Sequence, residues 1–177
     1  MGRMAPACGA AAIGVALLTA GAPAAGQQVR GEDAQACIAG TGPAIRVNIV
    51  GLKDRRGRLK LELYPGREED YLKDDHDLKR EGKFFGRSFA ETPASGAVVL
   101  CIKAPRPGTY GLFFTHDRDG KNKFNFWQDG AGFPSNRKMG RSRPKVADGL
   151  VQVGSGVTTV TIHAQYLRGL GFSPMSS

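Results

Sequence analysis

The chain has 177 residues, of which 41% are hydrophobic and 23% are charged, and its formal net charge is +9. This length fits one domain with its own core, once processed segments at the ends are subtracted. The apolar run near the N-terminus is well short of the roughly 20 residues that cross a bilayer, which argues against a transmembrane anchor.

Residues 1–26 have the pattern of a secretory signal peptide. Arg3 supplies a positive charge, residues 10–18 form a short apolar run, and residues 22–26 are mostly small. This pattern predicts cleavage near residues 24–26 and a periplasmic or secreted mature protein. Cys8 precedes the apolar run, so it is not placed like the acylated cysteine of a lipoprotein.

The mature chain stays strongly basic, because Arg3 is the one charged residue that the predicted leader removes. Outside the cytoplasm, nucleic acid is not the expected partner of such a protein. An anionic envelope component, such as lipopolysaccharide or an acidic polymer, or a small phosphate-bearing ligand fits the charge better. The alternative is that the charge only keeps the protein soluble. The oligomeric state is not indicated.

Two cysteines remain after cleavage, Cys37 and Cys101. An even number of cysteines in an oxidising compartment predicts one disulfide. A metal site at this pair is disfavoured, because neither cysteine has a Cys or His nearby at ligand spacing.

Apolar residues alternate, or form short runs, in about seven segments bounded by turn residues. The predicted strands are residues 45–49, 59–63, 84–90, 97–102, 109–115, 146–153 and 157–166. The first two are predicted to form a hairpin around a turn at residues 54–57. Such a series of short strands predicts an all-β protein, an antiparallel two-sheet sandwich over residues 44–167, with a small barrel as the alternative.

The remaining segments are not predicted to be regular. Residues 27–43 are interpreted as an extended leader held by Cys37 and residues 168–177 as a frayed tail. Residues 67–82 are so densely charged that a surface insertion with at most one short helical turn is expected. No segment predicts a convincing helix.

Several short motifs occur together downstream of residue 106. They are Pro-Gly-Thr-Tyr-Gly at 107–111, His-Asp-Arg-Asp-Gly at 116–120, Gly-Phe-Pro-Ser-Asn at 132–136 and Arg-Pro-Lys-Val-Ala-Asp at 143–148. In this combination the chain resembles the DUF2141 family, exported bacterial proteins of unknown function, over residues 45–166. The resemblance implies an immunoglobulin- or transthyretin-like β-sandwich and brings no established activity.

The family's loop after the central strand resembles a calcium loop with oxygen ligands at alternate positions. In this chain Asp117 and Asp119 fill the first and third positions, but Lys121 occupies the fifth and Asn125 replaces a later Asp. Calcium needs six to eight oxygen ligands, so the sequence disfavours a metal here. The favoured interpretation is that these side chains bond their own backbone and hold a tight turn. No cofactor is predicted.

His116 could act as a general base beside Asp117 or Asp119, as in a metal-dependent or hydrolytic enzyme. No nucleophile in a suitable context accompanies it, and a His at the end of an aromatic strand more often ties down a loop. An enzyme is therefore the alternative hypothesis, and no catalytic residue is assigned.

The best argument for function is ligand binding by residues 118–145, a Gly-rich excursion that carries aromatic and basic side chains. The candidate binding residues are His116, Asp117, Asp119, Trp127, Arg137, Arg141 and Arg143. Aromatic faces stack on rings, and guanidinium groups bind carboxylate or phosphate. The alternative is that Phe124, Phe126 and Phe133 plug one end of the sandwich while the basic residues form a solvated rim. The favoured function is a non-enzymatic binding or envelope-associated module.

Overall fold

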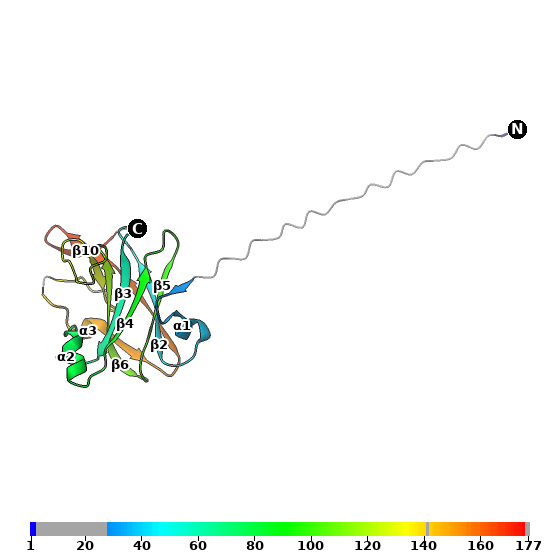
Figure 1. Cartoon of the computed structure of the whole chain (residues 1–177). Coiled ribbons are helices and arrows are strands. Elements are labelled where there is room, and N and C mark those ends of the chain that lie inside the picture. The colour runs from blue at the N-terminus through cyan, green and yellow to red at the C-terminus, as the bar shows by residue number, and fades with distance from the viewer. Residues whose placement is uncertain (3–27, 141, 176–177) are drawn as a thin grey trace.

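The computed structural model describes residues 1–2, 28–140 and 142–175, arranged as two β-sheets packed face to face (Figure 1). The predicted signal peptide, apart from its first two residues, and Arg141 lie outside the described residues. Within the described part of the chain, no helix is long and apolar enough to cross a membrane.

The smaller sheet has four strands in the order β1-β5-β2-β9. These are β1 (Val29–Arg30), β2 (Ala44–Val50), β5 (Val98–Lys103) and β9 (Val157–His163). β2 pairs antiparallel with β5 and parallel with β9, and β1 adds to the other side of β5 in parallel. The sheet therefore joins the beginning, the middle and the end of the domain.

The larger sheet has seven strands and is organised around β6. Its members are β3 (Arg58–Pro65), β4 (Gly86–Glu91), β6 (Gly108–Asp117), β7 (Gly130–Gly132), β8 (Leu150–Val153), β10 (Gln165–Arg168) and β11 (Gly171–Pro174). The main path is β11-β10-β7-β6-β3-β4, and all of its pairs are antiparallel. On its side away from β3, β6 pairs with β8 along its first half and with β7 along its second.

The core lies between the sheets and comes from alternate residues of the strands. Leu59, Leu61 and Leu63 on β3 and Leu112 and Phe114 on β6 are essentially buried. They pack against the apolar residues of β2 and β5 in one continuous cluster. Burial of alternate residues is what a strand with one face on a core requires. The all-β two-sheet sandwich is thus confirmed, and the sheets do not close into a barrel.

The predicted hairpin of the first two strands is wrong. β2 pairs with β5 and β9 in the smaller sheet, whereas β3 pairs with β4 and β6 in the larger one. Gly51, with a φ of 75°, begins the connection that carries the chain from one sheet to the other. Alternating apolar residues identify the buried face of a strand but not its partner, so two consecutive strands with a turn signal between them do not have to pair.

The last predicted strand, residues 157–166, is in fact two strands in different sheets. β9 ends at His163, β10 begins at Gln165, and the crossing is made by the fully buried Ala164. Its N–H donates to the carbonyl of Val50 at 2.8 Å, which satisfies the backbone at the crossing. One buried residue therefore joins the two sheets.

The described residues contain three short helices, α1 (Ala34–Ala39), α2 (Asp75–Arg80) and α3 (Val146–Gly149). α2 is the short helical turn that the sequence allowed within residues 67–82. α1 was not predicted, and the strand predicted over residues 146–153 is wrong in its first half, which forms α3. α1 lies on one flank of the sandwich, and α2 and α3 lie on the other (Figure 1). α2 is capped by Asp74, whose side chain accepts from the N–H groups of its first turn. Helices this short take their stability from packing, which a periodicity search over a long window does not detect.

Both terminal segments are more ordered than the sequence predicted. The interpretation of residues 27–43 as an extended leader is wrong for most of the segment, because it contains β1 and α1. The interpretation of residues 168–177 as a frayed tail is also wrong where described, because β11 pairs with β10 and Phe172 is fully buried. β1 is ordered by the distant strand β5, whereas β11 forms a hairpin with the adjacent β10.

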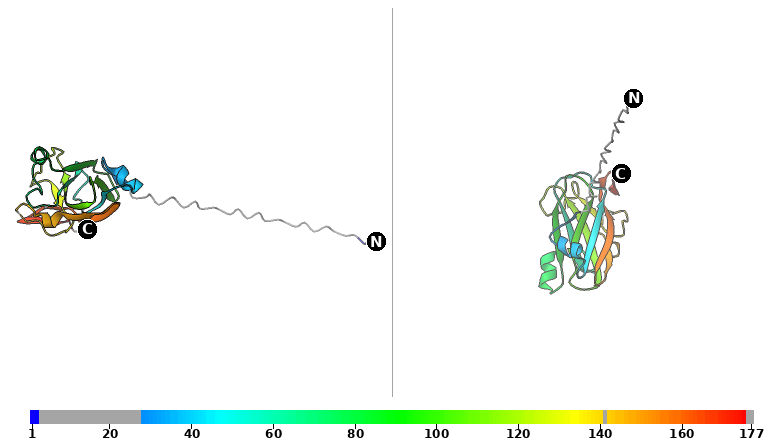
Figure 2. Two further views of the ribbon diagram at one scale, coloured as in Figure 1. Left: turned by 90° about the horizontal axis from the view of Figure 1, so that it is seen from below. Right: turned by 90° about the vertical axis from the view of Figure 1, so that its right-hand side faces the viewer.

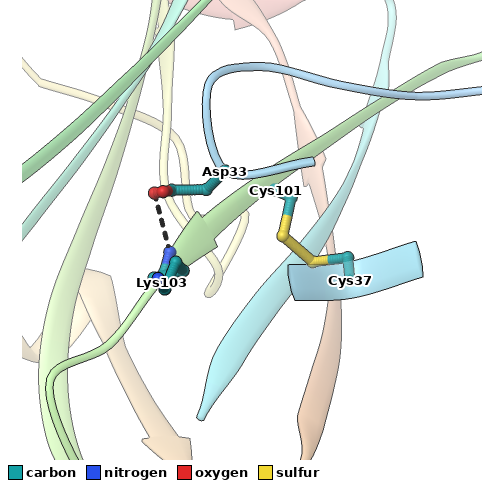
Figure 3. The surroundings of a disulfide bond; sticks show 4 residues. All are labelled: Asp33, Cys37, Cys101 and Lys103. Carbon is teal, nitrogen blue, oxygen red and sulfur yellow. Dashed lines mark hydrogen bonds between the residues drawn. A yellow bond between two sulfur atoms is a disulfide. The ribbon is translucent and has the colours of Figure 1, made fainter. Parts of the chain in front are cut away.

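The disulfide between Cys37 and Cys101 is confirmed. It joins α1 to β5 with the two Cα atoms 6.0 Å apart (Figure 3). Beside it, the backbone N–H of Lys103 donates to Asp33 at 3.0 Å, which ties the start of α1 to the end of β5. α1 faces the viewer in the right-hand view of Figure 2, in front of the strands that it covers.

Candidate functional site

The predicted site at the end of β6 is divided between the two faces of its sheet. The side chain of His116 lies on the core-facing side of β6, fully buried next to Tyr166. Asp117 is the next residue of the strand, so its side chain lies on the opposite, outer face. The predicted grouping of His116, Asp117 and Asp119 therefore does not converge on one cleft.

Both ring nitrogens of His116 are occupied. Nε2 lies 2.7 Å from the carbonyl oxygen of Arg56, which can only accept, so Nε2 carries the proton. Nδ1 then accepts from the hydroxyl of Tyr166 at 2.6 Å, and that hydroxyl accepts in turn from the N–H of Lys53 at 3.1 Å. Burial lowers the pKa of His116, so the neutral imidazole is the stable form. His116 and Tyr166 therefore tie the connection between β2 and β3 to the ends of β6 and β10.

Arg118 follows the same pattern of internal pairing. Its guanidinium binds the carboxylate of Asp54 through Nε at 3.0 Å, and it donates to the carbonyl of Gln128 at 2.8 Å. The hydrogen bond from Arg118 is the main reason why the pKa of Asp54 is lowered. Its contacts therefore hold the loop of residues 118–129 against the end of the sandwich.

On the outer face, Asp117 and Asp119 are joined by a third carboxylate, Asp129. One carboxylate oxygen from each lies within 4.8 Å of the others. Asp117 and Asp129 are each 1% exposed. Asp129 was not among the predicted site residues. It precedes β7, whose register places Gly130 opposite His116, and so Asp129 lies beside Asp117. In the sequence, Asp129 only follows an aromatic run, and its position beside Asp117 depends on the register of β6 with β7.

The phenylalanine side chains in segment 118–145 lie against the outer face of the larger sheet. The idea that they plug one end of the sandwich is wrong for Phe124 and Phe126, which pack on Phe172 of β11 with ring centroids 6.3 Å and 4.9 Å away. Phe133 belongs to the same outer cluster. The excursion is also not continuous, because β7 returns the chain to the sheet in its middle.

These aromatic side chains surround a cavity of about 330 Å³, which we call the aromatic cavity. Its floor is the outer face of β3 and β6, and its walls come from residues 118–129, from β11 and from residues 139–144 on either side of the undescribed residue 141. It is lined by Lys60, Glu62, Tyr64, Leu72, Phe113, Thr115, Phe124, Phe126, Met139, Gly140, Ser142, Arg143, Pro144 and Phe172. A volume of this size is at the lower end of the range for small-molecule sites.

The floor of the aromatic cavity holds a buried ion pair. The ammonium of Lys60 lies 3.4 Å from the carboxylate of Glu62, and both residues are only 6% exposed. Lys60 also donates to the side-chain oxygen of Asn122 at 3.4 Å. Glu62 has a second cation, since the guanidinium of Arg87 lies 2.8 Å from the same carboxylate. Arg87 also lies 3.5 Å from Asp75, so Glu62 keeps a cationic partner when Lys60 bonds to another group.

The basic candidates lie around the rim of the cavity. Arg143 lines the cavity, and its guanidinium donates to the carbonyl of Tyr71. Arg137 and Lys138 line a neighbouring depression of about 310 Å³ that shares Arg143. Trp127 is 80% exposed and touches Phe126 edge-on, outside the cavity lining. The structure thus brings Arg137 and Arg143 together and leaves Trp127 apart, while Arg141 lies outside the described residues.

A family model matches residues 47–161, and its description is "Uncharacterized protein conserved in bacteria (DUF2141)". No curated protein and no solved structure matches the chain. The family resemblance inferred from the motifs is therefore confirmed, while the closer likeness to immunoglobulin or transthyretin sandwiches stays an expectation.

Proposed function

The chain belongs to the DUF2141 family of bacterial proteins, and we propose that this member is an exported, non-enzymatic binding protein whose site is the aromatic cavity. The observation that carries the proposal is a cavity with five aromatic side chains in its lining above a buried Lys60–Glu62 pair. Concave, mostly apolar sites with a few placed polar groups are what small ligands bind.

The lining supports a small amphipathic anion as the ligand class. Phe113, Phe126 and Phe172 provide an apolar surface for a chain or a ring system. Lys60 and Arg143 provide the cationic groups. Lys60 can donate to a ligand oxygen without leaving Glu62 uncompensated, because Arg87 keeps its own ion pair with that carboxylate.

Export is part of the proposal. It is supported by the apolar run at residues 10–18 and by the disulfide between Cys37 and Cys101, since such bonds persist in oxidising compartments. The enzyme alternative loses its main support, because His116 uses both ring nitrogens within the fold and is separated from Asp117 by the sheet.

The test is a set of matched ligands on the purified mature protein, namely decanoate, decanol and decylammonium, measured by calorimetry. We expect decanoate to bind about tenfold more tightly than decanol, because a charge-assisted hydrogen bond contributes about 1.4 kcal/mol or more. Decylammonium should bind most weakly. Lys60→Gln should reduce the affinity for decanoate several-fold toward that for decanol, because Arg143 is then the remaining cationic group, and should leave the affinity for decanol unchanged.

Phe126→Ala should weaken the binding of both decanoate and decanol, because it removes a wall of the cavity. Trp127→Ala is the matched control, since it truncates the neighbouring aromatic residue outside the cavity lining. Full affinity in Phe126→Ala would contradict the proposal. A second result would also contradict the proposal. The protein would be retained on lipopolysaccharide, decanoate would not displace it, and replacing Arg137 and Lys138 by Gln would abolish retention. That result would assign binding to the basic rim.

A further inference from the structure

We propose that Asp117, Asp119 and Asp129 form a weak divalent-cation site that prefers calcium, at the neck of the loop between β6 and β7. This inference is independent of the aromatic cavity and departs from the expectation that Lys121 and Asn125 exclude calcium. That expectation assumed that the ligands follow one another along the loop. In the structure the third carboxylate comes from the far end of the loop.

The first observation is the spacing of the carboxylates. Calcium–oxygen distances are about 2.3–2.6 Å, so two ligands on opposite sides of the ion lie about 4.6–5.2 Å apart. The three carboxylate oxygens lie within 4.8 Å of one another. This spacing admits calcium, whose flexible coordination suits carboxylates fixed by the fold better than the strict octahedron that magnesium demands.

The second, independent observation is an unpartnered oxygen. Asp117 is 1% exposed, and its Oδ1 is buried without a hydrogen-bond partner among the described residues. Its Oδ2 accepts from Arg58 at 3.2 Å and from the N–H of Asn122 at 2.9 Å. Burying a carboxylate oxygen without a hydrogen-bond donor costs free energy, and a cation bound in the cluster would offset that cost.

The other two carboxylates retain capacity for a metal ion. Asp129 accepts from the N–H groups of Arg118 and Asn125, at 2.9 Å and 2.7 Å, one on each oxygen. Each carboxylate oxygen has a second lone pair, so these bonds orient Asp129 without exhausting it. The side chain of Asp119 is 15% exposed, which leaves an open side for water molecules to complete the six to eight ligands that calcium takes.

Lys121 does not block the site. Its ammonium lies 3.4 Å from Asp119, but the Lys121 side chain is 76% exposed. An exposed ion pair of this kind is worth little and can open toward solvent. Arg58 is the more persistent competitor, because it also donates to the carbonyl of Gly120 at 2.8 Å. With these cations nearby, affinity in the range of extracellular calcium modules is expected, a Kd of about 0.1–1 mM.

The test titrates calcium chloride into the metal-free mature protein at constant ionic strength and follows both the heat of binding and the melting temperature. At about ten times the Kd, the Tm of the wild type should rise by about 3–6 °C. An equal concentration of magnesium should produce a smaller rise, and chelation should reverse both. Asp119→Asn should abolish the calcium effect, because it removes one of three charged ligands from a solvent-facing position.

Two further variants make the result specific. Lys121→Gln should tighten calcium binding several-fold, because it removes the cation that competes for Asp119. Glu69→Gln, which neutralises an exposed carboxylate outside the cluster, should bind calcium like the wild type. Absence of saturable heat and of a Tm rise in the wild type would overturn the proposal. An equal rise in the wild type and in Asp119→Asn would also overturn it.

Discussion

The two outer faces of the sandwich are covered in different ways. The four-stranded sheet is covered by α1, which packs small residues such as Ala44 and Val99 against the disulfide of Cys37 and Cys101. The seven-stranded sheet is covered by α2 and by long loops that present aromatic residues to a charged floor. A short helix held by a covalent bond covers its face closely, whereas the loops leave the aromatic cavity.

The difference indicates where function can be located. Small side chains next to a disulfide fit together at close range. Large rings meeting Lys60 and Glu62 cannot fill the space evenly, because the two charged groups must keep their own partners. The loop-covered face is therefore the one whose sequence can change with the ligand while the sandwich stays intact.

The largest expected effect comes from removing the covalent cover. Replacing Cys37 and Cys101 together by Ala opens a link between residues 64 positions apart. The free energy of unfolding should fall by about 4 kcal/mol, because the unfolded chain gains loop entropy. Urea unfolding of the oxidised wild type and the double variant measures this. A reductant should destabilise the wild type and leave the variant unchanged. A loss below about 1 kcal/mol would show that α1 covers its sheet without the bond.

The second prediction extends the comparison to the interior, where His116 is neutral. Because burial lowers its pKa in the folded state, the unfolded chain binds the proton first as the pH falls. Stability should therefore be full above about pH 6.5 and decrease below it, by at most about 1.4 kcal/mol per pH unit. Denaturant unfolding between pH 7.5 and 5 measures the slope, and His116→Gln should flatten it. A wild type whose stability is constant across this range would contradict a buried neutral imidazole.

The third prediction weakens the cover of the larger sheet by one hydrogen bond. The buried Tyr71 donates from its hydroxyl to the carbonyl of Leu112 at 3.1 Å. Tyr71→Phe keeps the ring contacts with Tyr64 and Phe113 and removes that bond. It should cost about 1 kcal/mol in urea unfolding. A cost near zero would mean that the aromatic packing alone holds this segment.

The smallest effect is expected at the outer edge of the loop cover. Trp127 is 80% exposed, so Trp127→Ala should change the free energy of unfolding by less than about 0.5 kcal/mol. Urea unfolding measures this change. It is followed by far-ultraviolet circular dichroism, because the variant has no tryptophan fluorescence. A larger loss would show that the ring packs onto the loop more than its exposure indicates.

The sequence was informative where the pattern is local. Alternation of Leu59, Leu61 and Leu63 identified a strand and its buried face, and the count of exported cysteines identified the disulfide. Partnership between strands was not local. β2 and β3 are consecutive and belong to different sheets, and no residue between them signals the crossing.

The same limit applies to the candidate site. His116 was a candidate binding residue, with a structural role as the alternative suggested by its position at the end of an aromatic strand, and its two hydrogen bonds agree with the structural role. Asp129 was missed because it meets Asp117 only through the register of β6 with β7. Lys60 and Glu62 were not among the predicted site residues, because they alternate with Leu59, Leu61 and Leu63 on the other face of the strand, which distant loops bury.

The parallel pairing of β2 with β9 has a consequence for how the protein folds. Ala44 pairs with Val157, so the inner strand of the smaller sheet completes its hydrogen bonds only when residues 157–163 near the C-terminus are present. Such distant contacts must close a long loop before any stabilisation is gained, which places this topology among slow, cooperative folders, on the order of milliseconds to seconds. A chain interrupted before β9 would expose an unpaired strand edge, so a C-terminal truncation should yield aggregates rather than a smaller folded domain.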